Sequence, residues 1–241
     1  MTTRGVAPRP LDPRAAVRAM RALVANPDDT AQVFRIVRAL SGDSFERLYQ
    51  RALADPTGRQ VLERKSDILP VLQDRERLRS LPEGTLGRSY AAFVDRERIT
   101  ADGLVEASNE DLDEPIFRDE KARVFSRRLR DTHDLWHVVT GYQRDLFGEA
   151  ALLAFTFAQT RNRGIGFIVL IAMFKQWSEG HRDAVRLTWN GWRRGKRAGF
   201  FVAADWEALL ELPLDEVRSA LNVTDPPRYA PMFSAQAAAA H

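Results

Sequence analysis

Two of the four histidines of this chain stand at a spacing that suits metal binding. His133 and His137 are four residues apart, so on a helix their imidazoles project from one face and can point at one ion. Asp134 lies about 100° around that helix and can act as a third ligand or as a partner that fixes a histidine tautomer. The spacing alone leaves two interpretations open: a metal site, or two histidines that serve the surface or the core.

Glu149 is the best downstream candidate for a further ligand. On a straight helix it would lie roughly 24 Å from His133 and on nearly the opposite face. Gly141 and Gly148 supply breaks, because glycine is the usual helix terminator, and residues 142–145 between them are polar. A helix–loop–helix reversal would bring Glu149 back over the histidines. We therefore predict one divalent ion, zinc first and iron or manganese as alternatives, held by His133, Asp134, His137 and Glu149.

Helix signals dominate the chain and strand signals are almost absent, which predicts an all-α fold, a single-domain multi-helix bundle. The histidines should lie on one long helix over residues 117–140, and Glu149 at the start of a helix over residues 148–158. Thr85 can cap a helix that runs to about Arg98. Further helices are expected over residues 165–177, 179–196 and 214–221.

The single helical domain is predicted over residues 12–230, between flexible tails at residues 1–11 and 231–241. The chain has 241 residues, of which 44% are hydrophobic and 29% charged, a composition typical of globular proteins. The acidic residues 101–115 predict a solvated loop. No apolar run approaches the ~20 residues that a membrane-spanning helix needs.

Composition excludes several classes of function. The chain has no cysteine, so disulfides, thiolate metal sites and cysteine nucleophiles are excluded. The net charge is only +3 and the charges are mostly interspersed, so nucleic acid is not expected as a partner. The abundance of arginine and alanine indicates a GC-rich genome and hence a bacterium, in whose cytoplasm we expect the protein.

Two other metal-dependent classes fit less well. A metal phosphohydrolase of the His-Asp type draws a histidine from an earlier helix, and no histidine precedes His133. A di-iron bundle of the ferritin kind needs two Glu-x-x-His repeats, and the chain has none.

The site pattern itself resembles a known family. His133-Asp134-x-x-His137, then eleven residues and Glu149, is similar to the signature of the fourth coenzyme Q (ubiquinone) biosynthesis protein family. The upstream turn Leu81-Pro82-Glu83-Gly84-Thr85-Leu86-Gly87-Arg88-Ser89-Tyr90 resembles the turn that precedes the motif in that family. The resemblance covers about residues 81–221 and is weaker over the N-terminal third.

This resemblance implies a function. It implies a homodimeric, peripheral membrane protein that works with other ubiquinone-biosynthesis proteins, here at the inner membrane of a bacterium. It implies a prenyl-lipid pocket and removal, oxidative or not, of the C1 carboxyl from a polyprenylated 4-hydroxybenzoate-type ring. A noncatalytic role is also attributed to the family. The alternative is therefore a prenyl-lipid-binding scaffold of the pathway in which the metal is structural.

Two further regions can serve that chemistry. In the loop before Glu149, Arg144 could clamp a carboxylate and Asp145 could carry a proton, although a solvated turn is the simpler explanation of both residues. The helices over residues 149–174 are hydrophobic nearly all round, which predicts a pocket for the prenyl chain or simply a core.

Overall fold

The computed structural model describes residues 5–7, 10–26, 29–97, 117–225 and 227–233. Within these ranges all regular structure is helical, apart from isolated bridges between Val6 and Phe117 and between Thr85 and Pro213. The predicted all-α class is confirmed. The chain divides into two compact units: one comprises Met1–Ala7, Glu46–Gly141 and Ala198–Asp225, and the other Pro8–Phe45, Tyr142–Arg197 and Pro226–His241. The extent of the domain over residues 12–230 stays a prediction.

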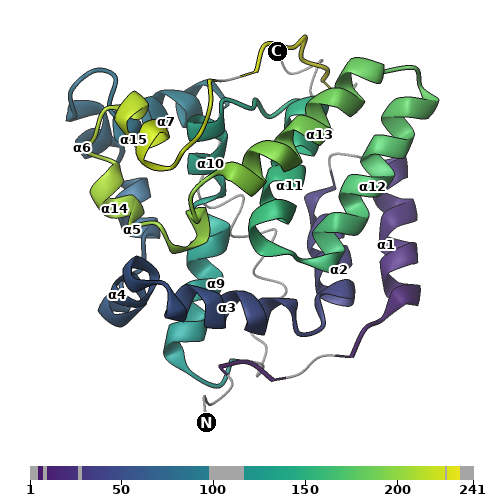
Figure 1. Cartoon of the computed structure of the whole chain (residues 1–241), viewed down its shortest axis with the longest axis horizontal. Helices are drawn as coiled ribbons and strands as arrows, with labels where there is room; N and C mark the ends of the chain where they lie inside the picture. Colours follow the sequence, from purple (N-terminus) through teal and green to yellow (C-terminus); the bar gives the residue numbers. More distant parts are fainter. Residues whose placement is uncertain (1–4, 8–9, 27–28, 98–116, 226, 234–241) are drawn as a thin grey trace. The chain divides into compact units, whose positions relative to one another are not determined.

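The first unit is made of short helices, and one of them, α10 (His133–Thr140), carries both histidines (Figure 1). This helix packs against α7, α9 and α15. It is hydrophobic on most of its surface, and every residue from Asp134 to Thr140 is buried. The other elements are α3 (Ser44–Ala54), α4 (Pro56–Arg64), α5 (Leu69–Gln73), α6 (Arg75–Ser80), α7 (Leu86–Arg96), α9 (Glu120–Asp131), η1 (Phe201–Ala203), α14 (Trp206–Leu209) and α15 (Leu214–Ala220).

The predicted long helix over residues 117–140 is in fact two helices, because α9 ends at Asp131 and α10 begins at His133. Thr132 stands between them. Its hydroxyl donates to the carbonyl of Arg128 at 2.7 Å, a bond to the preceding turn that commonly bends a helix. As predicted, Gly141 ends α10: its φ of 76° is in the left-handed region that favours glycine.

Arg128 fixes α9 to the C-terminal part of the same unit. Its guanidinium donates to both carboxylate oxygens of Glu207, each at 2.6 Å, and only 6% of Arg128 is exposed. Burial acts against the charged form of Glu207, but the hydrogen bonds from Arg128 outweigh it, so the pKa of Glu207 lies below its ordinary range. The pair thus anchors α9 directly upstream of the histidine helix.

The second unit consists of α1 (Pro13–Ala25), α2 (Thr30–Ser41), α11 (Leu146–Thr160), α12 (Arg163–Ser178) and α13 (Arg182–Arg197) (Figure 1). The helices α11 and α13 lie closest together, because Gly191 and Gly195 let the α13 backbone approach Ala151 and Phe155 of α11 where a Cβ would clash. Between α1, α2 and α12 lies a core that includes Met20, Ile36 and Ile168.

One side of α12 is left uncovered. Leu170, Phe174 and Trp177 are exposed by 66%, 66% and 63%, and their spacing puts them on one face of the helix. The uniformly apolar character of α12 therefore reflects a core contact on one side and an exposed apolar stripe on the other. None of the described helices is both long and apolar enough to span a bilayer.

Parts of the predicted tails are bound to the helical body. Val6 is buried, and its amide donates to Glu46 at 3.0 Å. Met232, in the predicted C-terminal tail, is bonded through both its amide and its carbonyl to residues near the start of α11. The predicted solvated loop over residues 101–115 lies outside the described residues, as do residues 234–241.

Candidate metal centre

His133 and His137 occupy successive turns of α10, as the spacing predicts. Their ring centroids are 5.0 Å apart and their rings are nearly perpendicular. His137 is 1% exposed, and the ring of Phe93 from α7 stacks against it with centroids 5.6 Å apart. Phe93, which the sequence analysis did not single out, therefore restricts the rotation of this imidazole.

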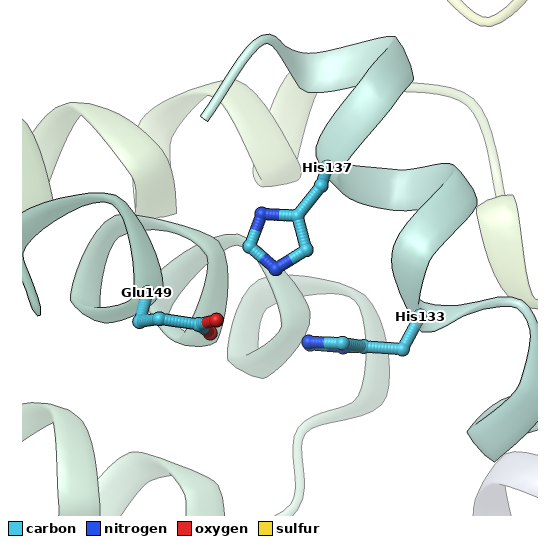
Figure 2. Close-up of side chains that lie close together, drawn as sticks. All are labelled: His133, His137 and Glu149. Atoms are coloured by element: carbon cyan, nitrogen blue, oxygen red, sulfur yellow. The ribbon is translucent and has the colours of Figure 1, made fainter. Parts of the chain in front are cut away.

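His133, His137 and Glu149 together form a group with the donor set of a metal site. Each offers one ligand atom, and these atoms all lie within 4.8 Å of one another. Figure 2 shows the three side chains directed toward one another, the two histidines from one helix and Glu149 from another. Two imidazole nitrogens and one carboxylate oxygen suit zinc, and also iron or manganese. These residues fit the predicted ion.

Asp134 is not a member of this group, although the two histidines of its motif, His133 and His137, are. Its side chain is buried, with 6% exposure, and its Oδ1 atom accepts no hydrogen bond from the described part of the chain. Such an atom costs about 1–3 kcal/mol of desolvation unless something satisfies it. A buried, unsatisfied carboxylate oxygen beside the histidines is what a site that binds a cation or a polar ligand would leave.

The first turn of α11 carries Glu149, whose backbone amide donates to the carbonyl of Asp145 at 2.8 Å. The guanidinium of Arg144 lies 3.6 Å from the Glu149 carboxylate, and both side chains are about one-third exposed, at 29% and 33%. Arg144 is thus placed next to a candidate ligand, where the sequence analysis expected it.

Asp145 is buried, and both of its oxygens are occupied. Oδ1 accepts from the amides of Phe147 at 3.0 Å, Gly148 at 3.3 Å and Met232 at 3.0 Å, while Oδ2 accepts from the Tyr229 hydroxyl at 2.6 Å. Asp145 is therefore the N-cap of α11, which begins at Leu146 rather than at the expected Gly148. Gly148 is not a helix break but part of the first turn.

Tyr229 is the residue at this end of α11 that sequence reasoning missed. Burial and the hydrogen bond to Asp145 raise the pKa of Tyr229 above its ordinary value, so its hydroxyl keeps the proton that it donates. The same oxygen accepts from the amide of Gln143 at 2.9 Å. No local signal could have found this pairing, because Tyr229 is 84 positions from Asp145.

The fold and the histidine–carboxylate group define an all-helical protein with a candidate metal centre, and comparison with known proteins identifies its family. The family model for the coenzyme Q (ubiquinone) biosynthesis protein Coq4 matches residues 13–227. The chain belongs to this family, as the motif around His133 suggested.

Curated fungal proteins are similar over most of the chain. The mitochondrial ubiquinone biosynthesis protein coq4 of Aspergillus flavus is 34% identical over 183 residues, which are 75% of this chain and 61% of the relative. The corresponding protein of Pyricularia oryzae is also 34% identical over 75% of this chain and 58% of its own length. The chain thus spans about three-fifths of the length of these relatives.

A solved structure shows the same fold. The crystal structure of a protein from Nostoc punctiforme superimposes with a TM-score of 0.66 and covers 90% of this chain and 100% of its own. Only 22% of the aligned residues are identical, so this likeness concerns the fold alone.

The expected location in a bacterial cytoplasm, at the inner membrane, is corrected by these comparisons. The fungal relatives are named as mitochondrial proteins. The expectation of a bacterium rested on the abundance of arginine and alanine, which reflects the base composition of a genome and carries no information about a cellular compartment.

Proposed function

We propose that this chain is a metal-dependent decarboxylase of ubiquinone synthesis, which removes the C1 carboxyl from a polyprenylated 4-hydroxybenzoate-type ring. The observation that carries the proposal is the convergence of His133, His137 and Glu149. The family match gives the pathway, ubiquinone biosynthesis. The substrate class is what the resemblance of the motif implies. By likeness to the fungal relatives, we infer a mitochondrial setting.

The number of grouped ligands favours a catalytic over a structural metal. Structural zinc sites are usually closed by four protein ligands, whereas catalytic sites keep three and leave a position for water or substrate. Three ligand atoms meet here, and Asp134 stands outside the group. Its buried carboxylate can instead orient a ligand or a bound molecule.

Loss of the carboxyl breaks the bond between C1 and the carboxyl carbon. Without an oxidant, the carboxyl leaves as CO2, the electron pair of the broken bond stays on the ring, and C1 takes up a proton. With dioxygen as the two-electron oxidant, the carboxyl again leaves as CO2 and C1 gains a hydroxyl, while one water is consumed and dioxygen is reduced to hydrogen peroxide. A bound divalent ion supplies positive charge that positions the carboxylate or phenolate and spreads the developing negative charge. His133, His137 and Glu149 would hold this ion in place.

Arg144 is the chain's own candidate for binding the substrate carboxylate. It is within 3.6 Å of Glu149 and is partly exposed, so it can reach a molecule at the site. A guanidinium binds a carboxylate through two parallel hydrogen bonds, which would fix the orientation of the leaving group.

The exposed stripe on α12 supports contact with lipid. Three large apolar side chains, Leu170, Phe174 and Trp177, lie on one face of the second unit. Exposed patches of this kind mark interaction sites, and tryptophan favours the boundary between water and membrane. A polyprenylated substrate resides in a membrane, so we propose that this stripe meets the membrane surface.

The alternative is a noncatalytic prenyl-lipid-binding scaffold with a structural metal. The α12 stripe supports this alternative as well, because a lipid contact needs no reaction. A homodimer and contacts with other proteins of the pathway stay predictions under both functions.

One experiment separates the two functions. Metal-loaded protein is incubated with a prenylated hydroxybenzoate, with and without oxygen, and loss of the carboxyl is followed by mass spectrometry. We expect turnover by the wild type and by Glu179→Gln, whose carboxylate pairs with Lys175 on an exposed surface. We expect none from Glu149→Gln at an unchanged melting temperature. A wild type without turnover, together with early melting of Glu149→Gln, would favour the scaffold.

A further inference from the structure

The C-terminal segment 227–233 is bonded to the loop that precedes α11. The Tyr229 hydroxyl donates to Asp145 and accepts from the amide of Gln143. Met232 donates its amide to Asp145 at 3.0 Å, and its carbonyl accepts from the amide of Leu146 at 2.8 Å. The segment thus holds the chain on both sides of the cap residue.

Asp145 passes this restraint to the first turn of the helix. Its side chain accepts from the amides of Phe147 and Gly148, and its carbonyl accepts from the amide of Glu149. Asp145 is 1% exposed, so water does not compete for these bonds. The orientation of the first turn, and therefore the direction in which Glu149 leaves it, depends on how Asp145 is held.

Close packing leaves this arrangement little room to shift. A Cβ on Gly148 would collide with the carbonyl oxygen of Gln143 and with the Tyr229 hydroxyl. Glycine at this position lets the loop, the first turn of α11 and the C-terminal segment meet.

We propose that Tyr229 is a positioning residue for the metal centre: through Asp145, it fixes the first turn of α11 and thereby aims the carboxylate of Glu149. This inference rests on the proposed function, since it assumes that Glu149 is a ligand. It gives Asp145 a positioning role in place of the proton transfer considered from the sequence. Removal of groups that orient metal ligands typically weakens metal binding about 10- to 100-fold.

The chain contains a matched control in its first unit. The Tyr49 hydroxyl donates to Asp119 at 3.1 Å, and Asp119 caps α9 by accepting from the amide of Ala122. The chemistry is the same as at Tyr229, a tyrosine bonded to a helix-capping aspartate. The first turn of α9, however, carries none of the candidate ligands. Tyr49→Phe therefore reports what the loss of such a hydroxyl does to stability alone.

The test compares the wild-type chain, Tyr229→Phe and Tyr49→Phe, with Co²⁺ as the probe. The affinity for Co²⁺, its visible absorption spectrum, the melting temperature and amide exchange of residues 146–148 are measured for each. We expect Tyr229→Phe to bind Co²⁺ about tenfold more weakly, with an altered spectrum and faster exchange at these amides. Tyr49→Phe should match the wild type in affinity and spectrum. Both variants should melt at similar temperatures, because each loses one hydroxyl that is bonded to a helix-capping aspartate.

The outcomes separate the positioning role of Tyr229 from the existence of the metal centre. If the wild type binds Co²⁺ and Tyr229→Phe keeps the same affinity and spectrum, the positioning role is overturned while the metal centre stands. If both tyrosine variants lose affinity equally, the effect is general destabilisation, and the positioning role is again overturned. If the wild type itself binds no Co²⁺, the proposed function fails first, and Tyr229 has no ligand to position.

Discussion

Asp134 in the first turn of α10 and Asp145 at the N-cap of α11 are both buried and close in sequence to candidate ligands, yet the two aspartates are bonded in opposite ways. Asp145 accepts four hydrogen bonds and caps its helix. Asp134 leaves Oδ1 without a donor among the described residues, and α10 has no side-chain cap at all. Burial by itself therefore does not reveal the role of a carboxylate, whereas its hydrogen bonds do: the satisfied carboxylate stabilises the fold, and the unsatisfied one is available to a ligand.

The largest expected effect comes from the ligands on α10. Replacing both histidines, as His133→Ala plus His137→Ala, should reduce the metal content from about one divalent ion per chain to near zero, because a lone carboxylate retains little affinity. Elemental analysis of the purified proteins measures this. His181→Ala, which removes a histidine that packs on Phe147, is the control and should keep the ion. Equal metal content in all three proteins would refute the site.

The next effect comes from the ion pair between Arg128 and Glu207, which anchors α9 directly upstream of α10. Arg128→Ala removes the partner of Glu207 and leaves a largely buried carboxylate without its guanidinium, which should lower the free energy of unfolding by about 3 kcal/mol. Urea denaturation measures the loss. Arg77→Ala breaks an exposed pair with Glu211 and should cost less than about 1 kcal/mol. Similar losses in the two variants would show that α9 is not anchored through Arg128.

The two aspartates themselves provide the direct test of the comparison. Asp145→Ala should lower the free energy of unfolding by about 1–2 kcal/mol, because the cap is lost and the donors of Tyr229 and Met232 face no acceptor. Asp134→Ala should leave it unchanged or raise it by up to about 1 kcal/mol, since a buried oxygen without a donor is removed. Thermal melts of the wild type and both variants, at equal metal content, measure these changes in stability. A larger loss of stability in Asp134→Ala than in Asp145→Ala would show that Asp134, rather than Asp145, is the aspartate that stabilises the fold.

The smallest effect is the contribution of Glu207 to pH dependence. Because its pKa is lower in the folded chain, the ion pair stabilises the fold fully above the ordinary glutamate value of about 4.3, and this contribution is lost as the pH falls through the lower, folded value. The stability difference between wild type and Glu207→Gln should therefore shrink on acidification below about pH 4. Denaturation curves of both proteins at several pH values measure this difference. A difference that stays constant with pH would contradict the lowered pKa of Glu207 in the folded chain.

Much of the candidate site could be predicted from the sequence, because it depends on residues that are only a few positions apart. The four-residue spacing of His133 and His137 sets both imidazoles on one face of any helix. Gly141 ends that helix, since a residue without a Cβ adopts the left-handed conformation easily. The all-helical class and the family also followed from local patterns and motifs.

Contacts between residues that are distant in the sequence could not be predicted without the folded structure. The break at Thr132, the start of α11 at Leu146 and the exclusion of Asp134 from the ligand group depend on individual hydrogen bonds and side-chain directions, which periodicity does not encode. The bond from Tyr229 to Asp145 joins residues 84 positions apart. The physical reason is that helix spacing fixes neighbours within one or two turns, whereas partners that are distant in the sequence are selected by the packing of the whole chain.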